Sequence, residues 1–295
     1  LGGGFEPALV ERLKADLAQL PTGQPLVTPP PAPKPVAGRR ITLVEKDTGS
    51  TAISLGFSLD VLRGSKDWYA LAIANSWLGQ HRNSGSHFYQ VIREDRGLNY
   101  GDYSYIEHFP NGGQRFLPPV NVARRRQIFE IWIRPVPHEA RHFALRAALR
   151  EFTQLVDSGL TREDFELKRS FLKKYVLHYA STTSDRLGYA LDDAFYGLAE
   201  SHLAKFRRMM DELTLDDVNA AIKRHWQVGN LQIAIVTQDA RAFADALVAD
   251  TPSPITYPSP KPPAILEEDK AIATFPLKIK REDVRIVPVA ELFVK

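Results

Sequence analysis

Apolar residues recur along this 295-residue chain with two periods, one typical of helices and one typical of strands. The first stripe has a helical spacing and predicts a short amphipathic helix near the start of the chain: Leu9, Leu13, Leu17 and Leu20. From Pro21 to Pro35 the sequence holds seven prolines, each of which lacks a backbone N–H and fixes φ. We therefore expect an extended linker there, with the main domain beginning after it.

Later stretches have strand character because they are rich in apolar residues or alternate between apolar and polar positions. They cover residues 41–44, 51–59, 100–109, 127–134 and 231–236. In the fourth stretch, Phe129, Ile131 and Ile133 fall on one face, and the residues between them fall on the other. This alternation predicts a strand with one face in the core.

Helix starts are marked by capping residues or prolines, and helix ends by glycine. Such starts occur near Ser65, Ser86, His138, Thr161, Thr183, Ser201 and Thr214. Strands and helices therefore come in runs and do not alternate strictly, which favours an α+β fold over a doubly wound parallel sheet. We predict a two-layer fold in which an antiparallel or mixed sheet packs against helices, with the strand at 231–236 central or well buried.

These patterns divide the chain into three parts. Residues 1–37 are interpreted as the tail of a preceding domain and a proline-rich linker, 38–250 as the main lobe, and 251–295 as an extended C-terminal tail. The chain starts at Leu1, followed by three glycines, so we interpret it as a processed product or a fragment.

Composition narrows the possible chemistry. The sequence has no cysteine, which excludes disulfides, thiolate zinc sites and a cysteine nucleophile. Its net charge is only +3, and the basic cluster Arg124 to Arg126 is interpreted as a solvated strand start, so we predict no nucleic-acid binding. No apolar run is long enough to span a membrane, so we expect a soluble protein. The compartment would be the periplasm or the exterior if a signal precedes the chain, and the cytoplasm otherwise.

One short motif matches a zinc site. His138, Glu139 and His142 follow the H-E-x-x-H pattern, in which two histidines one helical turn apart bind zinc and the glutamate activates water. Pro135 and Pro137 place both histidines at the beginning of a helix, where the positive end of the helix dipole disfavours a bound cation. We favour a pair of histidines at the border of the core, and an autonomous zinc protease stays as an alternative.

The segment 78–105, LGQHRNSGSHFYQVIREDRGLNYGDYSY, carries the most informative pattern. A predicted helix ends near Arg93, the pair Gly97-Leu98 follows, and Tyr100 comes seven residues after the arginine. Arginine offers a permanent cation with several donors, tyrosine offers a phenolic O–H, and Gly97 can adopt the left-handed conformation that reverses the chain. This segment resembles the second-lobe signature of the pitrilysin/insulinase family of zinc metallopeptidases. The order of elements from about 38 to 238 is similar to that of the family as well.

The resemblance implies the C-terminal, non-zinc lobe of such a peptidase, with the metallohydrolase fold of LuxS and the mitochondrial processing peptidase. It implies that Arg93 and Tyr100 contact a peptide or unfolded protein substrate and stabilise the transition state. This chain would hold no cofactor, and Zn²⁺ would lie in a partner lobe, either upstream in the same polypeptide or on another subunit. The family's zinc motif, H-x-x-E-H, is absent from the sequence, so we expect this chain to be inactive alone.

A second alternative is a structural subunit of a larger complex without a catalytic role. The presence of both Arg93 and Tyr100 argues against it, since a scaffold needs neither side chain.

Overall fold

The computed structural model describes residues 4–23, 29–109 and 116–293, and its centre is a six-stranded sheet in the order β3-β4-β2-β5-β1-β6. The strands are β1 (Arg39–Glu45), β2 (Thr51–Leu59), β3 (Asp102–Tyr105), β4 (Gln127–Val136), β5 (Leu231–Thr237) and β6 (Val284–Pro288). β1 pairs parallel with β5 and β6, whereas β2, β3 and β4 form antiparallel pairs. The predicted mixed sheet is confirmed. β5 lies inside it, between β2 and β1, as its apolar sequence predicts.

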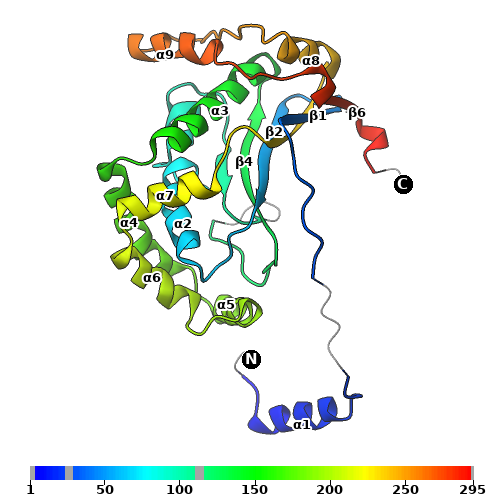
Figure 1. Ribbon diagram of the computed structural model, residues 1–295, viewed down its shortest axis with the longest axis vertical. Coiled ribbons are helices and arrows are strands. Elements are labelled where there is room, and N and C mark those ends of the chain that lie inside the picture. Colours follow the sequence, from blue (N-terminus) through cyan, green and yellow to red (C-terminus); the bar gives the residue numbers. More distant parts are fainter. Residues whose placement is uncertain (1–3, 24–28, 110–115, 294–295) are drawn as a thin grey trace.

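Helices cover one face of this sheet, which confirms the predicted α+β architecture (Figure 1). Their bounds are α1 (Pro7–Ala18), α2 (Lys66–Leu78), α3 (Arg141–Ser158), α4 (Arg162–Tyr175), α5 (Thr183–Tyr196), α6 (His202–Glu212), α7 (Leu215–His225), α8 (Ala240–Val248) and α9 (Pro263–Ala273). Figure 1 shows α2, α3, α4, α6 and α7 together on one side of the strands. α1 has no buried residue.

Several helices begin where the sequence predicts a cap. The side-chain oxygens of Ser65 and Thr161 accept hydrogen bonds from the first turns of α2 and α4. Thr182 and Thr214 form reciprocal capping boxes with Asp185 and Asp217 at the starts of α5 and α7. These local bonds satisfy backbone N–H groups that have no partner within the helix.

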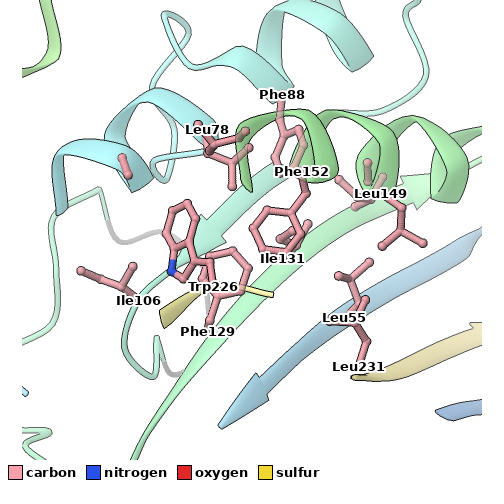
Figure 2. Packing of buried hydrophobic residues seen from close by; sticks show 14 of the residues in the cluster. Leu55, Leu78, Phe88, Ile106, Phe129, Ile131, Leu149, Phe152, Trp226 and Leu231 are labelled. Carbon is pink, nitrogen blue, oxygen red and sulfur yellow. The ribbon is translucent and has the colours of Figure 1, made fainter. Parts of the chain in front are cut away.

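The main core lies between the sheet and these helices (Figure 2). The Phe129 ring on β4 lies 4.9 Å from the Phe152 ring on α3 and 4.7 Å from the Trp226 ring beyond α7, measured between ring centres. On β4, Phe129, Ile131 and Ile133 are fully buried, as the alternation predicts. The other face of β4 is only partly covered, so one face of the sheet is left open.

The C-terminal region differs from the extended tail that we expected. It contains α9 and β6, and β6 completes the sheet beside β1. A proline occupies the first helical position of α9, where its missing N–H costs no hydrogen bond, so the prolines that indicated an extended chain mark a helix start. The strand expected over 100–109 is also shorter, because regular pairing covers only Asp102–Tyr105.

Candidate functional site

Arg93 lies on a short helix that ends abruptly. The predicted helix over 86–95 contains a π-helical segment, η1 (Tyr89–Glu94), and the Asp95 N–H donates to the Gln90 carbonyl oxygen at 2.9 Å. Gly97 has φ = +68°, and its N–H donates to the Arg93 carbonyl oxygen at 2.7 Å. The left-handed helix stop predicted at Gly97 is therefore confirmed.

The reversal brings Arg93 and Tyr100 together. The Arg93 guanidinium carbon Cζ lies 4.7 Å from the centre of the Tyr100 ring and 4.6 Å from that of the Tyr89 ring. The nearest carboxylate to Arg93 is that of Glu94, with 4.0 Å between Nε and Oε1, the outer limit of an ion pair. Tyr100 is 73% exposed, and no residue in the described part of the chain forms a hydrogen bond with its hydroxyl. The pair thus presents its polar groups to solvent.

Gly101 fixes the position of Tyr100 beside β4. Its carbonyl oxygen accepts a hydrogen bond of 3.0 Å from the Arg134 N–H. A Cβ atom at Gly101 would lie 2.5 Å from the Arg134 carbonyl oxygen, which is closer than real Cβ contacts allow. The Tyr103 hydroxyl also donates to the Tyr100 carbonyl oxygen at 3.2 Å. Only glycine therefore permits this approach of the Tyr100 backbone to β4.

The open face of β3 and β4 is unusually aromatic. Tyr103 is paired with Trp132, and Tyr105 with Glu130, so these four side chains share the face that the helices leave open. Tyr103, Tyr105 and Trp132 form, with Phe109, a cluster separate from the main core. Ser104 and Asp102 point inward instead, which reverses the usual orientation of an amphipathic strand.

This aromatic face forms a broad groove of about 620 Å³ that begins at Tyr100 and continues along β4 to Arg134. The Arg134 guanidinium stacks on the Trp132 ring, with 3.7 Å between Cζ and the ring centre. Burial lowers the pKa of Arg134 and raises that of Glu130, the other charged group of β4 in the groove. The groove can therefore offer aromatic surface and cationic N–H donors to an extended ligand.

Asp102 is a buried carboxyl group beneath this site. Its side chain is 1% exposed, and neither carboxylate oxygen has a hydrogen-bond partner among the described residues. Burial raises the pKa of Asp102 to about 7, and the neighbouring Asn99 and Arg93 counter only part of this rise. The charge state of a carboxyl group buried beneath the Arg93 site therefore changes near neutral pH.

The H-E-x-x-H residues have surroundings that do not fit a zinc site. His138 lies in a 3₁₀ turn, and its two ring nitrogens contact the Thr51 hydroxyl at 2.8 Å and the Thr48 carbonyl oxygen at 2.7 Å. His142 is buried against Phe243, and burial lowers its pKa to about 4. Glu139 is exposed. Across residues 4–23, 29–109 and 116–293, no group of three potential metal ligands comes together.

Sequence reasoning missed two residues of the site, Tyr89 and Asp102. Tyr89 lies four residues before Arg93, a spacing that places side chains together on a helix and could have been recognised. Asp102 could not have been recognised, because alternation alone does not tell which face of an edge strand lies inward when the outward face is aromatic.

In the part of the chain that the structure describes, no helix is long and apolar enough to cross a membrane.

Comparison with known sequences identifies the family. Residues 3–172 match the family described as "Peptidase M16 inactive domain". A curated relative from Mycobacterium tuberculosis, described as an uncharacterized zinc protease, is 26% identical over 206 residues, which cover 66% of this chain and 42% of the relative. The chain therefore spans less than half the length of that relative.

Solved structures agree with this assignment. An M16 inactive domain from Pseudomonas fluorescens has a TM-score of 0.61 at 24% identity, over 79% of this chain and 51% of that one. A protease from Helicobacter pylori has a TM-score of 0.63 at 15% identity, over 80% and 53% of the two chains. At such low identity these likenesses show the fold alone. Because the family match covers more than half of the chain, this chain belongs to the M16 peptidases as their inactive domain, which confirms its resemblance to the pitrilysin/insulinase family.

Proposed function

We propose that this lobe holds a peptide substrate through Arg93 and Tyr100 while a zinc-bearing lobe, on the same polypeptide or on a partner chain, cleaves it. The observation that carries the proposal is the position of the Arg93 guanidinium against the rings of Tyr89 and Tyr100, next to an open aromatic groove. Both rings contact the guanidinium without using its N–H groups as hydrogen-bond donors. Those donors are thus available to the carbonyl oxygens of a peptide.

The chemistry of peptide hydrolysis explains the use of this pair. A zinc site on the partner lobe would supply Lewis-acid chemistry for the attack of water on the scissile carbonyl. Negative charge then develops on oxygen, and Arg93 and Tyr100 provide fixed donors for it. The exposed Tyr100 hydroxyl needs no rearrangement within this lobe before it donates.

The groove supports a peptide or an unfolded protein as the substrate. It is open along the sheet and mixes stacked aromatic rings with the Arg134 cation, which suits an extended chain of varied sequence. The curated relatives, described as zinc proteases, are consistent with such a substrate.

A kinetic comparison in the complete protein, with its zinc-bearing lobe, tests the proposal. Tyr100→Phe should lower kcat on the order of a hundredfold with little change in KM, because its hydroxyl acts where charge develops. Arg93→Lys should also lower kcat, since an ammonium cannot replace the planar guanidinium. Tyr175→Phe, at a half-buried tyrosine of α4, is the matched control and should leave turnover unchanged. Wild-type turnover in both site variants, with the fold intact, would contradict the proposal and favour a scaffold role.

A further inference from the structure

A second, more enclosed hollow lies beside the groove, between α2, β3, α5 and α6. Its volume is about 90 Å³, and most of its large lining residues are aromatic: Trp68, Tyr105, Phe109, Tyr179, Tyr189 and Phe206. A cavity needs roughly 10–15 Å³ by this measure to hold one water molecule. The hollow therefore has room for a group of several heavy atoms, such as a phenyl ring or a branched aliphatic side chain.

The charged groups of the hollow are already neutralised by partners. Arg63 is buried and donates to both carboxylate oxygens of Glu107, at 2.6 to 3.1 Å, and to Asp192 at 3.1 Å. His202 contacts the Tyr69 hydroxyl at 3.1 Å, and burial holds the pKa of His202 well below its usual value, so its ring is neutral. Entry of a charged group would cost desolvation without a free counter-ion. The hollow selects an uncharged group.

The wall includes a buried tryptophan, Trp68, which is 6% exposed. Protein interiors rarely contain voids larger than a water molecule. A partly enclosed apolar volume of this size is therefore what is expected of a site that a ligand completes.

The hollow adjoins the groove. His81 and Phe109 line both, so the hollow and the groove share part of their walls. Phe116, which is exposed, lines the hollow as well, and the Arg82 guanidinium lies 4.5 Å from the centre of its ring. A peptide that lies along the groove can thus reach the hollow with one side chain.

We infer that this hollow is a specificity pocket that takes one large, uncharged apolar side chain, best an aromatic one, of the peptide bound in the groove. The inference rests on the proposed function, because it assigns the occupant to the same substrate. It adds what that function leaves open, namely a preference for one class of side chain at one position of the peptide.

Binding of small neutral probes to the complete protein tests the pocket without any cleavage. N-acetyl-phenylalaninamide should bind, and N-acetyl-alaninamide should not. In a ¹H–¹⁵N spectrum, the indole signal of Trp68, identified by its loss in Trp68→Phe, should shift when the phenylalanine probe is added. An unshifted Trp68 signal at saturating probe would overturn the inference.

Ala72→Phe fills the pocket, since Ala72 is a half-buried helical residue in its wall. It should weaken binding of the phenylalanine probe by about tenfold or more. Ala246→Phe is the matched control, because Ala246 is half-buried on α8 and does not line the pocket. Equal binding by the two variants would also overturn the inference.

Cleavage of a peptide series identifies the occupant. With phenylalanine or alanine placed in turn at each position, the wild type should prefer phenylalanine by about tenfold at one position, and Ala72→Phe should lose this preference. If the probe binds but no position shows a preference, the pocket takes a free small molecule and the assignment to a peptide side chain is wrong. Arg93→Lys and Tyr100→Phe should slow all peptides alike and leave the preference intact, so failure of the proposed function and failure of the pocket give different results.

Discussion

Arg146 and Asp250 form an ion pair in the structure, with 2.7 Å between Nη2 and Oδ1, although they lie 104 positions apart in the sequence. The Arg146 side chain is almost wholly buried in α3, and it also donates to backbone carbonyl oxygens of the C-terminal region: those of Asp250, Thr251, Ala273 and Phe275. One guanidinium therefore holds the segment after α8 against the body of the lobe.

We expect Arg146→Leu to lower the free energy of unfolding by about 3–5 kcal/mol, because it leaves these carbonyl oxygens and the Asp250 carboxylate without their donor. Urea unfolding measures the change. Arg241→Leu, at an exposed arginine of α8, is the control and should change stability by less than about 0.5 kcal/mol. Equal midpoints for the two variants would mean that Arg146 does not hold the C-terminal segment.

Asp102→Asn should change stability in a pH-dependent way. The pKa of Asp102 in the folded protein, about 7, lies above its ordinary value of 3.8, so the folded state binds this proton more tightly than the unfolded state does. The stability that this proton contributes is fully present below about pH 4 and is lost as the pH rises through 7. Asparagine cannot ionise, so between pH 5 and pH 8 the variant should become more stable relative to the wild type by up to about 3 kcal/mol. The measurement is the free energy of unfolding in urea at pH 5 and at pH 8. Asp47→Asn, at an exposed position, is the control and should show no such pH dependence. A stability difference between Asp102→Asn and the wild type that does not change with pH would refute the burial argument.

Gly101→Ala should destabilise the protein by about 1–3 kcal/mol, because the added Cβ would meet the Arg134 carbonyl oxygen at 2.5 Å. The expected readout is a lower thermal midpoint together with a loss of substrate turnover, since Tyr100 is the adjacent residue. Gly49→Ala provides the comparison, as a Cβ there meets no atom within 4 Å and the residue is exposed. A thermal midpoint unchanged by Gly101→Ala would show that the backbone at Gly101 and β4 can move apart without cost.

Tyr89→Leu removes one of the two rings that contact the Arg93 guanidinium. A cation–π contact at an accessible site contributes about 0.5–1 kcal/mol, so turnover by the complete protein should fall about two- to fivefold. In a double-mutant cycle with Arg93→Lys, the two effects should be less than additive, because both act through the orientation of the same cation. Strictly additive effects would mean that Tyr89 does not orient Arg93.

The sequence predicts much of this fold because local signals and tertiary structure agree. Capping at Ser65, Thr161 and Thr214 sets helix starts, and the alternation in β4 places Phe129 and its neighbours in the core. The left-handed stop at Gly97 could likewise be predicted, since few other residues adopt that conformation at low cost. The convergence of Arg93 and Tyr100 follows from that stop, whereas their role in substrate binding stays a prediction.

Other features depend on partners that are distant in the sequence. A proline is equally compatible with an extended tail and with the first position of a helix, so the sequence around α9 does not distinguish the two. The packing of the buried residues of α9 against the rest of the lobe decides between them. The inward orientation of Asp102 is also set by β4 and the helices, and not by its own strand. The hollow behind Trp68 combines residues from several helices and β3, so no single stretch of sequence reveals it.

The position of β1 in the sheet has a consequence for synthesis of the chain. Its partners are β5 and β6, and the residue paired with Arg39 is Leu231, about 190 positions later. At about 5–20 residues per second, a ribosome would take roughly 10–40 s to deliver that partner after β1 is made. During this interval the apolar residues Ile41, Leu43 and Val44 have no neighbouring strand. Nascent chains of this lobe should therefore depend on chaperones that cover β1 until β5 emerges.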